Sequence, residues 1–221
     1  MKTTQTLLAA VILGTALFTA TGAQAALQSR LGGLAVYDTD LNITWLANAN
    51  VNGTIGTPGA GAMTWAEANA WAAGLTVAGF SGWRLPTTPQ VDATCSNQGA
   101  NYSAGLNCTG SEMGHLFYTE LGGAANQSIN GTHNVSYSLF QNFQDYNYWS
   151  ATGNANDVNL AWNFTFLGGT QSASYLAGYK LDTAFALAVR PGDVAAVPEP
   201  EAWVLMLSGL ALVSAVARRR F

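Results

Sequence analysis

Residues 33–50 read GLAVYDTDLNITWLANAN, and this stretch decides the fold class. Two apolar and β-branched segments, residues 34–37 and 43–46, lie on either side of the polar centre Asp-Thr-Asp-Leu-Asn. Strand-forming residues on both sides of a short polar turn predict a β-hairpin. The domain therefore begins with antiparallel strands.

Two helices are predicted after this hairpin. Residues 64–74, TWAEANAWAAG, begin with a capping box formed by Thr64 and Glu67, and Gly74 is placed to end the helix. Residues 111–122, SEMGHLFYTELG, form the second helix. Its apolar residues share one face, and Gly122 follows its end; they are Met113, Leu116, Phe117 and Leu121.

The last third of the body has the period of β-strands. In residues 159–166, NLAWNFTF, large apolar side chains alternate with smaller or polar ones, which predicts a half-buried strand. Residues 185–193, FALAVRPGD, alternate in the same way and close the domain. Two helices among antiparallel strands predict an α+β domain.

Both ends of the chain carry targeting features. A basic start, an apolar stretch and Ala23-Gln24-Ala25 predict a signal peptide, residues 1–25. Residues 202–217 are uncharged, would span about 24 Å as a helix, and precede Arg218, Arg219 and Arg220. We interpret them as a transmembrane helix with cytoplasmic arginines, so that the body, residues 26–197, faces outward from the inner membrane.

Charge and cysteine content limit the function of the body. The body contains four cationic side chains and ten carboxylates, and this acidic balance argues against nucleic acid as a partner. The abundant neutral polar residues suit partners such as sugars. Cys95 and Cys108, in an exported chain, predict a disulfide. By the chain-entropy model this crosslink is worth roughly 3 kcal/mol.

No catalytic constellation is evident. His115 and His133 are the two histidines of the chain, and the sequence contains neither an H-E-x-x-H nor a G-x-S-x-G motif, so we expect a protein that is not an enzyme. We interpret His115 as structural, Glu67 as a helix cap and Glu120 as part of a solvated helix face.

Three side chains are candidate ligand-binding residues. Asp145, Asn147 and Trp149 lie in DYNYW, an aromatic and polar cluster suited to a loop. With Asp157, the polar pair Asp145 and Asn147 is also a candidate for calcium. No other metal or cofactor is predicted.

The tryptophans outside DYNYW lie in strand or helix patterns, where we expect core packing; they include Trp45, Trp65, Trp83 and Trp162. Asp38, Asp40 and Asn42 have the spacing that opens an EF-hand loop, but the Gly and Glu required further along are missing. We interpret these three side chains as capping the hairpin turn.

The C-terminal segment, residues 198–221, resembles a known sorting signal. Pro198-Glu199-Pro200, an apolar helix and the final arginine cluster are similar to the PEP-CTERM signal of Gram-negative bacteria that make exopolysaccharide. The resemblance implies recognition and cleavage by an exosortase, an integral-membrane cysteine-type transpeptidase. The protein would then pass to the cell surface or extracellular matrix.

Seven segments of the body resemble, in order, the Lcl C-terminal domain family: VYDTDLNITWL, MTWAEANAWAAGL, SGWRLPT, HLFYTELG, YWSAT, AWNFTFLGG and LAVRPGD. This resemblance implies a C-type-lectin-like fold, with two helices, a twisted antiparallel sheet and a surface that binds sulfated or other polysaccharides. The expected function is a glycan-binding or adhesive module. A purely structural matrix protein and a polysaccharide-acting enzyme are the alternatives.

Overall fold

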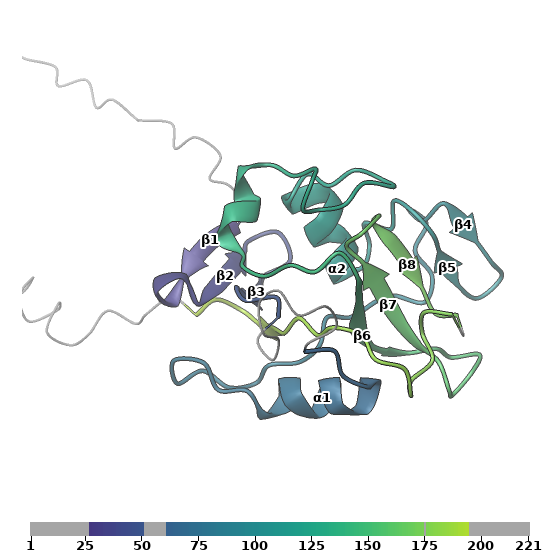
Figure 1. Ribbon diagram of the computed structural model, residues 1–221, viewed down its shortest axis with the longest axis horizontal. Helices are drawn as coiled ribbons and strands as arrows, with labels where there is room; N and C mark the ends of the chain where they lie inside the picture. Colours follow the sequence, from purple (N-terminus) through teal and green to yellow (C-terminus); the bar gives the residue numbers. More distant parts are fainter. Residues whose placement is uncertain (1–26, 51–60, 175, 195–221) are drawn as a thin grey trace, which may run out of the picture.

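The computed structural model describes residues 27–50, 61–174 and 176–194 (Figure 1). The predicted signal peptide and the sorting segment with its predicted helix, residues 202–217, lie outside these ranges. Among the helices within them, none combines the length and the apolar character that a membrane crossing requires.

The first sheet contains the predicted hairpin. Its order is β1 (Leu27–Arg30), β2 (Ala35–Asp38), β3 (Ile43–Leu46) and β9 (Val189–Pro191), and all its neighbours are antiparallel. Strand β2 begins and ends one residue later than predicted. Asp38 Oδ1 accepts from the amides of Asp40 and Leu41 at 3.1 and 3.0 Å, which confirms its predicted role in the turn.

A second sheet lies beside the first one and has the order β6 (Asn147–Gly153), β7 (Ala161–Thr165), β8 (Thr170–Ser172). A small ribbon, β4 (Asn97–Gln98) with β5 (Ser103–Ala104), extends beyond β8 at one end of the molecule (Figure 1). Residues 184–189 join the two sheets. The amide of Phe185 donates to Asn147 O at 2.9 Å, and Ala188 O accepts from the amide of Leu46 at 2.8 Å.

Both predicted helices are present. Helix α1 (Trp65–Gly74) begins with the complete capping box of Thr64 and Glu67. Gly74 is its last residue, and the chain leaves the helix in an extended conformation at Leu75 instead of turning at a left-handed glycine.

The second helix is α2 (Glu112–His115), which continues as a π-helix (Leu116–Glu120), η2, and is followed by Gly122 at φ 68°. All four of its predicted core residues are buried. A short 3-10 helix, η3 (Val135–Leu139), and another, η1 (Leu31–Gly33), were not predicted.

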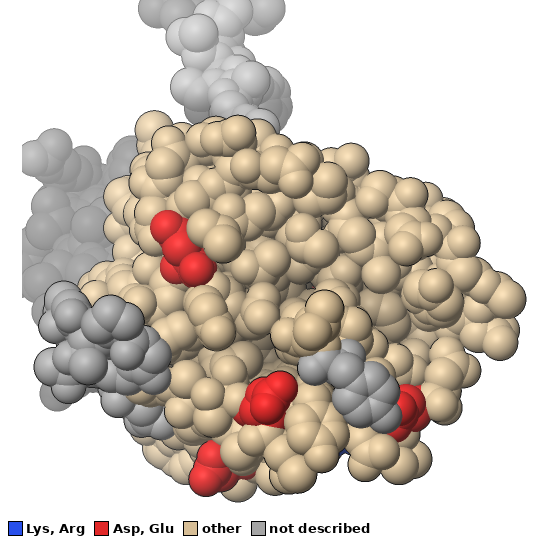
Figure 2. Space-filling model, turned by 45° about the vertical axis from the view of Figure 1, so that its right-hand side comes forward, with Lys and Arg blue, Asp and Glu red and all other residues tan. Residues whose placement is uncertain are grey.

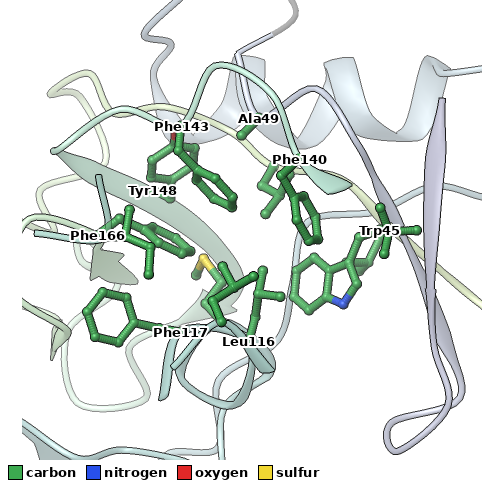
Figure 3. Packing of buried hydrophobic residues seen from close by; sticks show 14 of the residues in the cluster. Trp45, Ala49, Leu116, Phe117, Phe140, Phe143, Tyr148 and Phe166 are labelled. Carbon is green, nitrogen blue, oxygen red and sulfur yellow. The ribbon is translucent and has the colours of Figure 1, made fainter. Parts of the chain in front are cut away.

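Two hydrophobic clusters form the interior. The aromatic cluster, shown in Figure 3, is rich in rings; these come from Trp45, Phe117, Phe140, Phe143, Tyr148, Phe164, Phe166 and Phe185. The alanine-rich cluster surrounds Trp83 and Trp149 with small side chains; these are Ala35, Ala68, Ala72, Ala161, Ala184, Ala186 and Ala188.

The structure confirms a mixed α and β domain with antiparallel sheets and two helices, although the strands of the described ranges form three sheets where one was expected. The prediction of a half-buried strand at residues 159–166 is wrong. Strand β7 is buried on both faces, because Phe164 packs in the aromatic cluster and Ala161 in the alanine-rich cluster.

Candidate functional site

A cavity of about 460 Å³ opens where the β4–β5 ribbon approaches β8 and the β6–β7 connection. We call it the hairpin cavity. Its walls carry two aromatic residues together with amides, hydroxyls and one carboxylate; they are formed by Asn97, Tyr102, Ala104, Asn154, Asn156, Asp157, Leu160, Trp162, Ser172, Ala173 and Ser174.

Tyr102 supplies an accessible aromatic ring at this cavity. Its side chain is 42% exposed. The amide of Gly99 donates to Tyr102 O at 2.8 Å, which closes the tip of the ribbon. A Cβ atom at position 99 would collide with the Tyr102 ring, so the glycine is what allows the ring to lie across the turn.

Hydrogen bonds hold the opposite wall in shape. Asn154 Nδ2 donates to Ala173 O at 3.3 Å, and Asn154 Oδ1 accepts from the amide of Asn156 at 2.8 Å. Asp157 Oδ1 accepts from the amide of Asn159 at 2.9 Å. The β6–β7 connection therefore presents its amide groups from a defined loop.

The ribbon itself is anchored at its base. The predicted Cys95–Cys108 disulfide is present and closes the loop that contains β4 and β5. Buried Asp92 accepts from the amides of Thr94 and Gly110 at 2.9 Å each. Because both connections hold the base of the loop, they restrict the positions that Tyr102 can take.

The cavity is poor in charge. Among its described lining residues Asp157 is the single carboxylate, and lysine, arginine, histidine and cysteine do not occur. Figure 2 turns this end of the molecule forward and shows a surface that is mostly uncharged, with a few carboxylates. The site therefore favours a neutral ligand that forms hydrogen bonds.

A second, smaller hollow of about 270 Å³ contains two of the predicted ligand-binding residues. We call it the strand-end hollow; it is lined by Tyr146, Asn147, Trp149, Leu176, Ala177, Asp182 and Thr183. Residues 173–174 line the hairpin cavity and residues 176–177 line this hollow, so one segment of chain contributes to both.

The expected loop placement of Trp149 is wrong. Trp149 belongs to β6, is fully buried, and donates from Nε1 to Met63 O at 2.8 Å. Tyr148 and Trp149 are consecutive in β6, so their rings lie on opposite faces of the strand. Tyr148 packs in the aromatic cluster and Trp149 in the alanine-rich cluster, which leaves no free face of Trp149 for a sugar. Tyr146, one of its neighbours, is 54% exposed in the hollow.

Asp145 does not join this group. Its carboxylate accepts a hydrogen bond from Ser128 Oγ, and it lines neither hollow. The candidate calcium ligands Asp145, Asn147 and Asp157 thus lie in three different surroundings. A calcium site formed by these three side chains would need them to share one surrounding.

The remaining ionisable candidates have mixed outcomes. Glu67 is the helix cap that was predicted, and its hydrogen bonds with Thr64 lower the pKa of its carboxyl. The assignment of Glu120 to a solvated face is wrong, since its side chain is 5% exposed and lies 3.2 Å from His115 Nε2. Burial and the charge of Asp38 raise the pKa of Glu120. His133 is exposed and stacks on Tyr137.

Comparison with known proteins identifies the body of the chain. The model of the Lcl C-terminal domain matches residues 34–190. The chain belongs to the Lcl C-terminal domain family. No curated protein and no solved structure matches it, so the C-type-lectin-like fold stays a prediction.

The PEP-CTERM protein-sorting motif matches residues 196–220, which include the predicted Pro198, Glu199 and Pro200 and the three arginines. This motif marks an exported protein that is anchored in the membrane before an exosortase processes it. The motif itself lies outside the described residues.

The Lcl C-terminal domain uses its Trp-Arg-Leu-Pro segment to connect its parts. Arg84 forms two hydrogen bonds with the Glu112 carboxylate at 2.7 and 2.8 Å, and Glu112 lies in the first turn of α2. Trp83 and Leu85 are buried in the alanine-rich cluster. This segment therefore has a structural role.

Tyr102 and the hairpin cavity were not predicted from the sequence. Of the lining residues, Asp157 was a candidate calcium ligand and Trp162 an expected core residue. Tyr102 lies in the loop between the cysteines, which is rich in Gly, Asn and Ser. A single aromatic residue in such a loop was the one sequence signal that could have indicated a binding site.

Proposed function

We propose that this protein is a non-enzymatic, glycan-binding component of the cell surface or extracellular matrix, and that its Lcl C-terminal domain binds sugar in the hairpin cavity. The observation that carries the proposal is the exposed Tyr102 ring, which faces a wall of asparagine and serine side chains. An aromatic face stacks on the apolar face of a sugar ring, while amides and hydroxyls bond its hydroxyl groups.

The size of the cavity supports a small ligand unit. Ligand pockets commonly enclose about 300–1,000 Å³, and the hairpin cavity of about 460 Å³ lies within this range. Its open end suits one or two residues of a longer chain better than a fully enclosed metabolite.

The charge of the site supports a neutral glycan rather than a sulfated one. A polyanion needs several cationic contacts, and none of the four cationic side chains of the body lines the cavity. They lie beside Asp193 (Arg30), Glu112 (Arg84), Val158 O (Lys180) and Ser81 O (Arg190).

The lining also supports binding without catalysis. Glycoside hydrolysis generally uses two carboxylates across the scissile bond. Asp157 is the one carboxylate among the described residues of this cavity, and it already accepts a backbone hydrogen bond.

The position of the cavity fits a protein that is first held by its tail. Arg30 Nε donates to Asp193 Oδ1 at 2.7 Å, so the first and last described segments lie together. In Figure 1 they lie at the β1 end of the molecule, and the β4–β5 ribbon lies at the opposite end. An anchored protein would therefore present the hairpin cavity away from its attachment.

The test is calorimetric titration of the body, residues 26–197, with the exopolysaccharide of the producing organism, with neutral oligosaccharides and with a sulfated polysaccharide. We expect saturable binding of a neutral glycan that calcium chelation does not change. Tyr102→Ala should weaken it by about fivefold or more, since loss of one base–aromatic stacking contact, taken as a guide, costs about 1–3 kcal/mol. Gly99→Ala should weaken it as well, because it displaces the same ring.

Tyr146→Ala is the matched control, because it removes another exposed tyrosine, from the strand-end hollow. If Tyr146→Ala abolishes binding and Tyr102→Ala does not, the site belongs to the strand-end hollow instead. Release of new reducing ends would identify an enzyme. Absence of binding to every glycan would leave a structural matrix protein.

A further inference from the structure

A buried group of ionisable side chains lies where the end of β2 meets α2 and the π-helix. Asp38, His115 and Glu120 each offer one possible ligand atom, and these atoms all lie within 4.8 Å of one another. Asp38 is fully buried, Glu120 is 6% exposed, and none of the three lines either hollow. The glycan site makes no use of this group.

The π-helix brings His115 and Glu120 together. Residues five apart in an α-helix lie about 140° apart around the axis, at about 100° per residue. Here the amide of Leu121 donates to Leu116 O, five residues earlier, at 2.9 Å. This wider turn places side chains five apart above one another, and His115 Nε2 lies 3.2 Å from Glu120 Oε1. Such π-helical turns are rare in proteins, and those that occur often lie at functional sites.

Among the residues that the structure describes, no lysine or arginine balances the charges of this group. The four cationic side chains of the body contact other partners, as described above. Buried carboxylates without a cation are costly, and His115 is the one basic side chain in the group.

The donor atoms also fit one class of ion. Two carboxylates and an imidazole are ligands that Zn²⁺ and similar divalent transition metals accept, whereas Ca²⁺ prefers oxygen alone. Asp38 is already oriented by the amides of Asp40 and Leu41 and by Trp45 Nε1, which donates to its Oδ2 at 3.2 Å. Outer hydrogen bonds of this kind hold ligating carboxylates in metal sites.

We propose that Asp38, His115 and Glu120 bind one divalent transition-metal ion. Its place between the hairpin, α2 and the π-helix means that the ion would crosslink segments far apart in the sequence. The site is separate from the hairpin cavity, so the proposal does not depend on glycan binding.

The experiment uses the exported protein purified from its producer, stripped with a chelator and titrated with ZnCl₂ by calorimetry. We expect one equivalent to bind and to raise the melting temperature. Glu120→Gln and His115→Gln should each weaken binding by tenfold or more. Both replace a ligand by a side chain of similar size, and cooperative melting of either variant establishes that it is folded.

His133→Gln is the matched control, because it removes the exposed histidine and leaves the proposed ligands intact. It should bind Zn²⁺ like the parent protein. The proposal is overturned if the stripped protein binds no Zn²⁺, if folded Glu120→Gln and His115→Gln bind it unchanged, or if His133→Gln alone loses it.

Discussion

The aromatic cluster and the alanine-rich cluster are built by the same strands from neighbouring residues. Val36 and Tyr148 pack in the aromatic cluster, while Ala35 and Trp149, next to them in the sequence, pack in the alanine-rich one. Residues 184–189 repeat this division, because Phe185, Leu187 and Val189 alternate between three alanines. Successive side chains of an extended chain point to opposite faces.

The difference between the clusters lies in how each one is covered. The aromatic cluster is filled by interlocking rings, such as Phe166 against Phe143 at 4.8 Å and Tyr148 at 5.0 Å between centroids. The alanine-rich cluster instead uses small side chains, including Ala68 and Ala72 of α1. Small residues let the helix approach the strands closely. The packing of the aromatic cluster therefore depends on large rings that fill space. The packing of the alanine-rich cluster depends on side chains small enough for α1 to approach.

The largest expected effect is a cavity in the aromatic cluster. Phe166→Ala removes a ring that contacts four others and should lower the free energy of unfolding by about 3–5 kcal/mol. Chemical denaturation measures the loss. Phe166→Leu should cost less, and a loss below about 1 kcal/mol for the alanine variant would contradict the close packing described here.

An increase in side-chain volume should destabilise the alanine-rich cluster. Ala186→Leu adds volume to the alanine-rich cluster and should destabilise the protein by about 1–3 kcal/mol. The same denaturation experiment measures it. A neutral or stabilising result would show that the alanine-rich cluster has room to spare, and the comparison between the clusters would fail.

Removal of each helix cap should affect one cluster more than the other. Thr64→Ala removes the cap of α1 and should cost about 1 kcal/mol. Hydrogen exchange should increase in α1 and stay unchanged in α2. Ser111→Ala removes the cap of α2, whose side chains enter the aromatic cluster, and should increase exchange in α2 while α1 stays unchanged. Equal effects of both variants on the two helices would indicate that the clusters do not respond separately.

The smallest effect appears only in alkaline solution. Burial raises the pKa of Tyr148, in the aromatic cluster. The stability that depends on its protonated phenol is complete below the unfolded pKa, about 10, and is lost as pH rises toward the folded pKa. Tyr148→Phe should therefore make the decline of stability above pH 10 shallower. Exposed Tyr146→Phe is the control, and an unchanged decline in the Tyr148 variant would count against burial as the cause.

Local signals in the sequence predicted the local structure well. Thr64 and Glu67 carried the information for the start of α1, because a capping box needs only two side chains of one turn. The hairpin of β2 and β3 was equally clear, since its turn is short. The π-helical turn at Leu116–Glu120 was not predictable, because the same apolar spacing also fits an α-helix.

The candidate sites depended on contacts that the sequence does not display. Trp149 was assigned to a loop because its neighbours are polar, and burial on both faces of β6 overruled that pattern. Tyr102 acquired significance only when the disulfide loop folded against β8. Glu120 was assigned to a solvated face because a helical pattern cannot show that β2 covers it with Asp38.

The sequence by itself determined the sorting motif, the mixed α and β class, the hairpin of β2 and β3 and the start of α1. These properties depend on residues close together in the chain, through a sorting motif, a helix cap and a short turn. Only the tertiary structure decided which face of each strand met rings or alanines, where a cavity opened and which carboxylates became neighbours. Those outcomes arise from packing between segments that are far apart in the chain. The order of residues does not show which of these segments come into contact.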